Sequence, residues 1–94
     1  SKWRINHAKN MEYQVRTKPS VDKELKTLAK TDYYRMLAAF TVLAKDPFVG
    51  KKMGGEYKNC YNYRVWPYRI VYQIYKKALI ILVIRVRHRQ GVYR

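Results

Sequence analysis

The chain has 94 residues, of which 48% are hydrophobic and 15% aromatic, so it can form one small globular core and is not a disordered protein. Its formal net charge of +15 excludes a near-neutral surface and favours a polyanionic partner such as a nucleic acid. The longest apolar run, residues 78–84, is far shorter than the roughly 20 residues needed to cross a bilayer, so no membrane partner is expected. A single cysteine, Cys60, excludes an internal disulfide, and no signal peptide is visible, so the expected location is the cytoplasm.

The N-terminal part predicts one strand after an extension. Residues 1–10 are polar and basic with no clear period, and we interpret them as a native extension or a cloning remnant. The domain is then expected at residues 11–94. Residues 13–16 alternate between apolar and polar side chains, which is the period-two pattern of a short strand.

Two helices are predicted next. Pro19 suits the first turn of a helix, and Ser20 is a capping residue. Val21, Leu25 and Leu28 follow at helical spacing, so they form one apolar stripe.

The second helix is predicted to begin at Thr31 or Asp32, either of which can cap it. It should end at Asp46, because Pro47 disfavours the helical conformation in the residue before it. Its apolar stripe, which we expect in the core, comprises Tyr33, Met36, Leu37, Phe40, Leu43 and Ala44. Residues 48–56 contain three glycines and are predicted to be a loop.

The remaining chain is typical of three strands. Residues 61–66 and 68–75 alternate in character, with Pro67 as the turn between them. Residues 79–84 are apolar on both faces, as expected of a central strand that is covered on both sides. Beyond them the strand alternates between a face of arginines and a face that includes His88. The arginines of that face are Arg85, Arg87 and Arg89.

The predicted order of elements is therefore β-α-α-β-β-β. This order indicates an α+β domain in which two N-terminal helices pack on a twisted, mainly antiparallel four-stranded sheet.

The distribution of charge suggests where a partner binds. All six acidic residues precede residue 57, so the strand-rich segment from 57 to 94 carries only cations. A strand surface with cations among aromatic rings can bind phosphates and stack bases. A soluble domain that is merely basic has the same composition.

The predicted hairpin brings three arginines toward one point. Arg69 lies near the start of its strand, Arg89 lies at the end of the next antiparallel strand, and Arg64 lies one strand over. Guanidinium groups arranged in this way can clamp a phosphate. Tyr93 and His88 lie at the same edge as candidates for proton transfer, which together suggests cleavage of a phosphodiester. No carboxylate cluster is present to hold a catalytic metal, so neither a metal nor another cofactor is expected.

Four short segments carry a resemblance to a known family. They are residues 18–25 (KPSVDKEL), 68–72 (YRIVY), 87–89 (RHR) and 92–94 (VYR). With these segments the chain resembles the RelE/ParE toxin superfamily, in its RelE branch. The resemblance implies the toxin of a bacterial or archaeal type II toxin–antitoxin system, which enters the ribosomal A site and cleaves the mRNA there. It also implies an acidic antitoxin as partner, and operator DNA as a target of the toxin–antitoxin complex.

The resemblance further implies roles for single residues. Arg69 and Arg89 match family arginines that stabilise the phosphate. Tyr93 matches a C-terminal tyrosine that contributes to base stacking and in-line geometry. Arg64 and Asn62 stand where family members carry lysines. Arg64 keeps the charge and Asn62 does not, so a proton-transfer role for lysine does not carry over.

The mechanism favoured at this point is metal-free transesterification. The RNA 2′-OH attacks the neighbouring phosphorus and leaves a 2′,3′-cyclic phosphate and a 5′-OH, while the arginines neutralise the charge that develops on the phosphate. His88 and Tyr93 are the candidate proton-transfer groups, although strand parity points His88 away from Arg87 and Arg89. The candidate RNA-binding residues are Lys51, Lys52, Lys58, Asn62, Trp66 and Arg87.

Two other functions fit the same sequence. One is a non-enzymatic inhibitor of DNA gyrase of the ParE type, which would share the fold. The other is a plain nucleic-acid-binding module. The combination of Arg69, Arg89 and Tyr93 favours the nuclease.

Overall fold

The computed structural model describes residues 12–88 of the chain. The predicted boundary between residues 10 and 11 lies outside this part. The helices are α2 (Pro19–Lys26) and α3 (Lys30–Lys45), with short 3₁₀ helices η1 (Pro47–Val49) and η2 (Gly55–Tyr57). The strands are β1 (Gln14–Thr17), β2 (Lys51–Lys52), β3 (Tyr61–Val65), β4 (Tyr68–Tyr75) and β5 (Ile80–His88).

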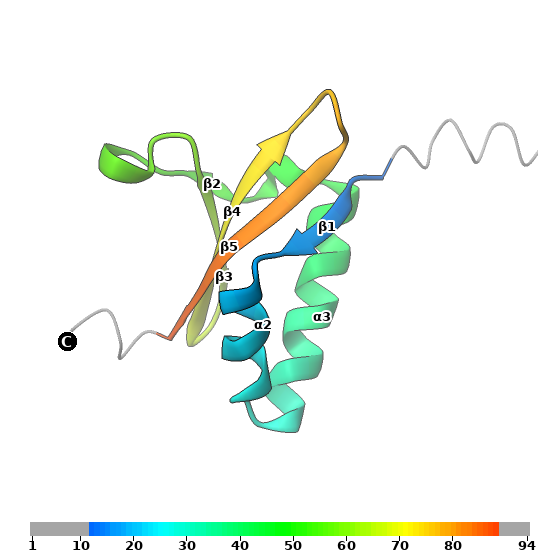
Figure 1. The fold of residues 1–94 in the computed structure, drawn as a ribbon, viewed down its shortest axis with the longest axis vertical. Coiled ribbons are helices and arrows are strands. Elements are labelled where there is room, and N and C mark those ends of the chain that lie inside the picture. The colour runs from blue at the N-terminus through cyan, green and yellow to red at the C-terminus, as the bar shows by residue number, and fades with distance from the viewer. Residues whose placement is uncertain (1–11, 89–94) are drawn as a thin grey trace, which may run out of the picture.

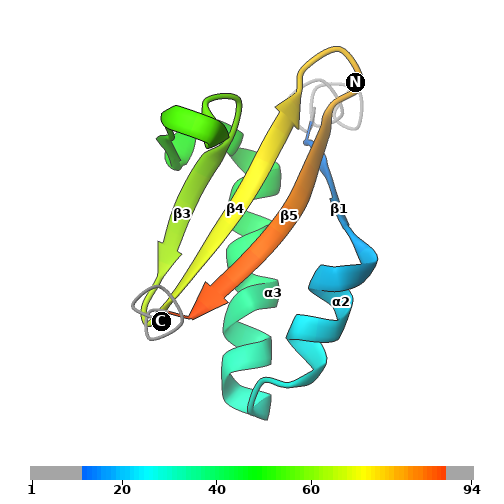
Figure 2. The ribbon, with the colours of Figure 1, turned by 60° about the vertical axis from the view of Figure 1, so that its left-hand side comes forward.

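The strands form one twisted sheet in the order β1-β5-β4-β3-β2 (Figure 1). β1 runs parallel to β5, and the other neighbouring strands are antiparallel. Both helices lie on the same face of the sheet, and no helix of residues 12–88 covers the other face (Figure 2). The predicted α+β class is confirmed, and the sheet has one strand more than predicted.

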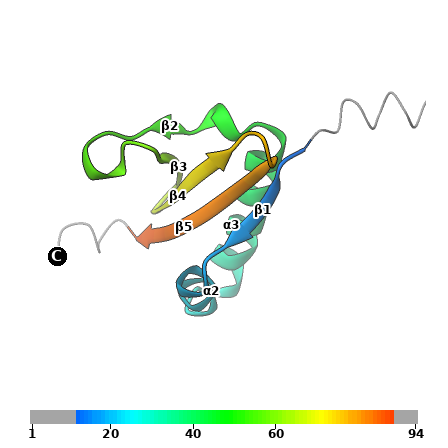
Figure 3. The same cartoon turned by 45° about the horizontal axis from the view of Figure 1, so that its top comes forward.

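The extra strand is β2, which lies in the segment predicted to be a loop. Lys51 pairs with Asn62 and Lys52 pairs with Tyr61, so β2 extends the sheet beyond β3 (Figure 3). The prediction of a four-stranded sheet is wrong here because two consecutive lysines carry no apolar alternation that would indicate a strand.

α2 begins at Pro19, as predicted, because the missing N–H of proline is not needed in the first turn. The capping role predicted for Ser20 is wrong, since Ser20 lies inside the helix. The capping position belongs to Lys18, whose side chain makes no capping hydrogen bond. Val21 and Leu25 of the predicted stripe are buried.

α3 begins at Lys30 rather than after a cap formed by Thr31 or Asp32. It ends before Asp46 and Pro47, as predicted. Asp46 then accepts a hydrogen bond from the backbone N–H of the second residue of η1 at 3.1 Å, so the chain turns directly out of α3.

The core fills the space between the two helices and one face of the sheet. Its buried members are Val21, Leu25, Met36, Ala39, Leu43, Ile70, Tyr72, Ile81, Val83 and Val86. Of the stripe predicted for α3, Met36 and Leu43 are buried, whereas Tyr33 and Leu37 are more than a third exposed. The buried stripe of α3 is therefore narrower than the sequence pattern indicates.

β5 lies between β1 and β4, as predicted for a central strand. The expected cover on both faces is wrong, since no helix of residues 12–88 lies over Ile80, Leu82 and Ile84, which are half-buried. One face of β5 is therefore available to carry polar groups at its end.

A bulge in β5 sets which side chains stand on that face. Val71 pairs with Arg85 and Tyr72 pairs with Val83, which leaves one residue of β5 unpaired between them. Because of this offset, Val83 before the bulge and Val86 after it are both buried toward the helices, and Arg85 stands on the opposite face. The bulge thus aims the basic end of β5 away from the core.

Candidate nucleic-acid interface

Three arginines form a row across the three longest antiparallel strands. Arg64 of β3 pairs with Arg69 of β4, and Arg69 pairs with Arg87 of β5. Directly paired residues of antiparallel strands point to the same face, and neighbouring strands lie about 4.8 Å apart. We call Arg64, Arg69 and Arg87 the arginine row. Their Cα atoms span about 10 Å across the sheet, and their guanidinium groups lie on the same face.

A second row lies beside the first. Lys51, Asn62, Val71 and Arg85 are paired in turn across β2, β3, β4 and β5. Strand alternation puts this row on the same face as the arginine row. We call this surface the cationic face, and its polar members are Lys51, Asn62, Arg64, Arg69, Arg85 and Arg87. Extended over four strands, it offers several phosphate-binding groups at once.

The cationic face has no compensating acid. None of the six acidic residues of the chain lies in a strand. Between the described side chains, the one ion pair joins Arg35 to Asp32, away from this face. Like charges directly opposite each other destabilise a sheet, so the row lowers the stability of the unbound domain. A bound polyanion would remove that repulsion, so the cationic face is suited to a polyanionic ligand.

Sequence reasoning predicted most of these residues and gave them different neighbours. The direct partner of Arg69 is Arg87, which was expected only as an RNA contact. Arg89 and Tyr93 lie outside the described residues, so their placement beside Arg69 stays a prediction. Asn62 stands on the cationic face, where it is polar but uncharged.

His88 lies on the opposite side of the sheet from the arginine row. It pairs with Tyr68, and the two rings meet edge-on with centroids 5.0 Å apart. With Glu24 and Leu28 these rings line a cavity of about 330 Å³ beside α2. The parity argument for His88 is confirmed, and its side chain faces the helices rather than a phosphate held at Arg69.

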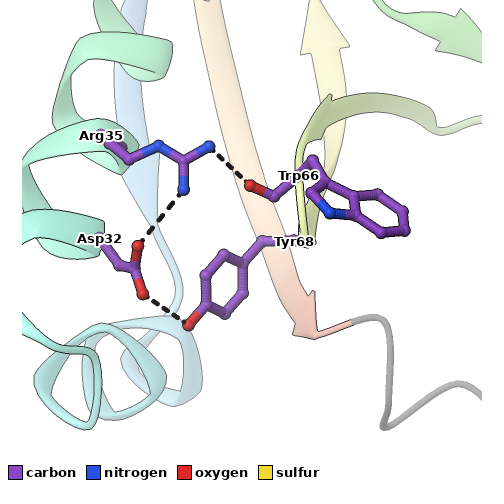
Figure 4. A network of polar contacts seen from close by, with 4 residues as sticks. All are labelled: Asp32, Arg35, Trp66 and Tyr68. Atoms are coloured by element: carbon purple, nitrogen blue, oxygen red, sulfur yellow. Dashed lines mark hydrogen bonds and ion pairs between the residues drawn. The ribbon is translucent and has the colours of Figure 1, made fainter.

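The turn between β3 and β4 is tied to α3 by a polar network (Figure 4). Arg35 Nη2 donates a hydrogen bond to the backbone oxygen of Trp66 at 2.6 Å. Arg35 Nη1 contacts Asp32 Oδ1 at 3.3 Å, and the hydroxyl of Tyr68 donates to Asp32 Oδ2 at 3.1 Å. Burial and this hydrogen bond to Asp32 raise the pKa of Tyr68 above its usual value.

This network fixes the segment that joins two members of the arginine row. Arg64 and Arg69 lie directly before and after the four-residue stretch 65–68, and α3 is hydrogen-bonded to two residues of that stretch, Trp66 and Tyr68. Trp66 is 54% exposed at the same end of the sheet, and its contact with RNA stays a prediction. Sequence reasoning missed Asp32 and Arg35 because their partners are 31 to 36 residues away.

The other end of the cationic face is anchored by a buried tyrosine. The hydroxyl of Tyr72 donates to the backbone oxygen of Pro47 at 2.7 Å, and burial raises the pKa of Tyr72 to about 12. Gly50 passes so close to that hydroxyl that a side chain would clash with it, and would also lie 2.8 Å from the backbone oxygen of Asn62. The absence of a side chain at Gly50 thus lets β2 approach β3 and places Lys51 on the cationic face.

The remaining predicted contacts lie off this face. Lys52 pairs with Tyr61 and, by alternation, points away from Lys51. Lys58 is exposed just after η2, in the segment between β2 and β3.

Within residues 12–88 no group of three or more His, Cys, Asp or Glu side chains could hold a metal ion. No helix in this part of the chain is long and apolar enough to span a membrane.

The similarity of the chain to a known family is clear. Residues 15–93 match the family model of the ParE toxin of the type II toxin–antitoxin system parDE. The chain belongs to this family. It is therefore a toxin of a type II toxin–antitoxin system, and the resemblance to the RelE/ParE superfamily is confirmed.

Solved structures show the same fold. The chain is similar to the toxin–antitoxin complex RelBE2 of Mycobacterium tuberculosis, with 28% identity and a TM-score of 0.78 over 83% of this chain and 99% of that chain. It is also similar to the archaeal RelE–RelB complex of Pyrococcus horikoshii, with 24% identity and a TM-score of 0.70 over 83% of this chain and 96% of that chain.

A third similar structure is the isolated RelE toxin of E. coli, with 24% identity and a TM-score of 0.70 over 86% of this chain and 90% of that chain. The likeness to the archaeal and E. coli proteins shows the fold alone. A comparison with curated protein sequences gives no significant match.

Proposed function

We propose that this toxin is a ribosome-dependent endoribonuclease that cleaves mRNA in the A site by metal-free transesterification. The observation that carries the proposal is the arginine row, in which Arg69 is flanked on both sides by another arginine at the same level of the sheet. Three fork-shaped, permanently charged donors on one line suit a phosphate whose negative charge grows during the reaction.

The chemistry asked of this row is electrostatic. When the 2′-OH attacks the phosphorus, negative charge develops on the non-bridging oxygens, and cations already in place stabilise it without reorganisation. Arg69 is the central member, so it is assigned the closest contact with the phosphate. Arg64 stands beside it as a second cation for the same phosphate, Arg87 contacts the RNA backbone on the other side, and Arg89 adds a further positive charge.

Proton transfer is assigned to Tyr93 ahead of His88. The side chain of His88 is on the helix side of the sheet, packed against Tyr68, whereas the phosphate would lie on the cationic face. A base must come within hydrogen-bond reach of the proton it removes. Tyr93 follows β5 in the sequence, and the resemblance to RelE toxins gives it a role in base stacking and in-line geometry, so we assign the proton transfer to it.

The partners follow from charge and from the relatives. The M. tuberculosis and P. horikoshii structures are toxin–antitoxin complexes. We propose an acidic antitoxin for this chain, because opposite charge speeds encounter with a +15 domain and a disordered acidic segment can cover a large surface as it folds. The complex would bind operator DNA, the free toxin would act on the ribosome and mRNA, and the site of action would be the cytoplasm.

A second candidate function is inhibition of DNA gyrase. The description of the matching family model, a ParE toxin, favours it. The fold serves both functions, so the decision depends on the cationic face. A gyrase inhibitor needs a protein-binding surface and no transition-state contacts, and a plain nucleic-acid-binding module needs cations and no reaction.

One experiment separates the three functions. The purified toxin is incubated with ribosomes that carry a defined mRNA, and in parallel with gyrase and relaxed plasmid. We expect new mRNA ends in the A-site codon, with a 2′,3′-cyclic phosphate on the upstream product and a 5′-OH on the downstream product, and unchanged supercoiling. Loss of supercoiling without mRNA cleavage would establish the gyrase inhibitor, and the absence of both effects would leave the plain nucleic-acid-binding module. Products with a 5′-phosphate would exclude transesterification.

A further inference from the structure

A pocket lies at the end of the sheet opposite the turn that holds Trp66. β3 begins at Tyr61, which pairs with Tyr72, whereas β4 continues to Tyr75. The last three residues of β4 therefore have no partner on β3, and a step forms in the sheet. This step pocket has a volume of about 410 Å³, and its lining includes Lys52, Asn59, Tyr61, Gln73, Tyr75 and Lys76.

The lining combines the three kinds of groups that bind a nucleotide. Lys52 and Lys76 are exposed cations for a phosphate. Tyr75, which is 48% exposed, offers a ring face on which a base can stack. Asn59 and Gln73 offer side-chain amides that can hydrogen-bond to a base edge. None of the residues that line the pocket is acidic.

Ring contacts support Tyr61, which lines the pocket. The rings of Tyr61 and Tyr72 are stacked, with centroids 5.8 Å apart, and Phe48 meets Tyr61 edge-on at 6.0 Å. The ammonium of Lys76 lies 5.3 Å from the centre of the Phe48 ring, which holds that charge beside the pocket. A preformed site loses less entropy when a ligand binds.

Gln73 is oriented by its neighbour. The hydroxyl of Tyr75 donates a hydrogen bond to Gln73 Oε1 at 2.7 Å. This contact occupies the acceptor of the amide and leaves its NH₂ donors for a carbonyl or ring nitrogen of a base. Tyr75 can thus present its ring for stacking while fixing the direction of the amide.

The step pocket adjoins the cationic face through Gln73 and Tyr75, whereas Lys52 and Tyr61 reach the pocket from the other side of the sheet edge. Arg69, Gln73 and Tyr75 all lie on β4 at alternate positions, so their side chains point to the same side of the sheet. At about 3.4 Å per residue, Gln73 and Tyr75 lie about 14–20 Å from Arg69 along the strand. A single strand of nucleic acid that crosses the arginine row can therefore reach the pocket.

We propose that the step pocket is a second nucleotide site, which binds one base and its phosphate from the same single strand, several nucleotides away from the phosphate at Arg69. The inference rests on the proposed function for the identity of the strand. The site takes a base by stacking on Tyr75 and by hydrogen bonds from Gln73, and it takes the phosphate between the two lysines. The arginine row holds the phosphate that reacts, and the step pocket sets the path of the strand.

The test measures binding without cleavage. The probe is a fluorescein-labelled single strand of eight nucleotides with 2′-O-methyl groups throughout, which cannot undergo attack by the 2′-OH. Affinity is measured by fluorescence anisotropy in the absence of ribosomes. Tyr75→Ala should weaken binding by about 5-fold or more, since stacking contributes about 1–3 kcal/mol per base. Tyr75→Phe keeps the ring and loses only the hydroxyl contact to Gln73, so its affinity for the probe should stay within about 2-fold of wild type.

Two adjacent lysines supply the matched control. Lys76 lines the pocket and Lys77 does not. Lys76→Ala should weaken binding and reduce the slope of log K against log salt by about 0.7, the value for one phosphate on a single strand. Lys77→Ala should weaken binding less and should change the salt slope less than Lys76→Ala does. Equal effects of the two lysines, or wild-type affinity in Tyr75→Ala, would overturn the proposal.

The outcome does not depend on catalysis. If wild-type toxin cleaves mRNA on the ribosome while Tyr75→Ala binds the probe normally, the pocket proposal fails and the proposed function stands. If binding depends on the pocket and no cleavage occurs, the proposed function fails and the second nucleotide site stands.

Discussion

The two faces of the same sheet differ in burial, in polarity and in charge. The face toward α2 and α3 is apolar and buried, and includes Ile70, Ile81 and Val83. The opposite face carries Arg64, Arg69 and Arg87 in one row, with no acid in any strand. Neighbouring residues of β4 therefore have opposite effects on the free energy of unfolding. Those on the buried face raise it, and the charged row lowers it until an anion binds.

The contrast between the two faces indicates which substitutions change stability and which change function. The helix-covered face holds the strands in register, and this register aligns the three arginines. A substitution on the buried face should change the free energy of unfolding and leave the chemistry of the folded fraction intact. A substitution on the cationic face should change the chemistry and should not lower the free energy of unfolding.

The largest expected effect is on the buried face. Met36 is fully buried in α3, so Met36→Ala leaves a cavity and should lower the free energy of unfolding by about 2–5 kcal/mol. Urea unfolding followed by circular dichroism measures the change. At a temperature where the variant stays folded, its rate of mRNA cleavage should remain close to wild type. A loss of activity larger than the loss of folded protein would show that the two faces are not separable.

The matching test on the cationic face is Arg69→Ala. It removes the central charge of the row and should lower the rate of mRNA cleavage on the ribosome by about 100-fold or more. Arg69 is exposed on its strand, so the free energy of unfolding should not fall. Lys26→Ala, which removes one exposed charge from α2, is the matched control and should cleave normally. Cleavage by Arg69→Ala at the wild-type rate would show that the row does not bind the reacting phosphate.

Tyr72 gives the buried face a signature in pH. Burial raises the pKa of its hydroxyl from 10.0 to about 12, so the folded state favours the neutral phenol. This stabilisation is fully present below pH 10 and is lost as pH rises from 10 to 12, with a total of roughly 2–3 kcal/mol. The free energy of unfolding of wild type, measured at pH 8, 10 and 11, should therefore fall more steeply than that of Tyr72→Phe. Parallel pH profiles would contradict the assignment.

Much of the buried face could be predicted from the sequence. The spacing of Val21 and Leu25 indicated a helix, and the alternation through residues 68–75 indicated a strand, because burial of one face imposes a period on the chain. The pattern failed at β2, where Lys51 and Lys52 have no apolar period. β2 forms through contacts that are distant in sequence, with Gly50 against the buried Tyr72 hydroxyl.

The cationic face could be predicted by composition but not by register. The arginines were recognised as candidates, yet the partner of Arg69 depends on how far β5 is displaced along β4, and the bulge beside Val71 contributes to that displacement. One unpaired residue changes every pairing beyond it. The contact of Arg35 with Trp66 has no local signal at all, since it depends on where the turn meets α3.

Loss of the contact between Arg35 and Trp66 is expected to have an intermediate effect on mRNA cleavage. Arg35→Gln removes the ion pair to Asp32 and weakens the hydrogen bond to the Trp66 backbone, so the turn beside Arg64 should loosen. A loss on the scale of one hydrogen bond should lower the free energy of unfolding by about 1 kcal/mol, and the loosened turn should lower kcat by up to about 5-fold. The readout of position is the fluorescence of Trp66 in a Trp3→Phe background, where its anisotropy should fall. Unchanged fluorescence together with unchanged kcat would show that α3 does not position the arginine row.

The smallest expected effect tests whether the arginine row really destabilises the unbound domain. Arg87 stands directly opposite Arg69, so Arg87→Gln removes one like-charge pair and should raise the free energy of unfolding by a few tenths of a kcal/mol at low salt. The gain should disappear in 1 M salt, where the Debye length is about 3 Å. Arg16→Gln is the control, because Arg16 lies opposite Leu82 and its loss relieves no paired cation. If Arg87→Gln is destabilising at low salt, the row is held by interactions of its own, and charge repulsion would no longer explain why this face favours an anionic partner.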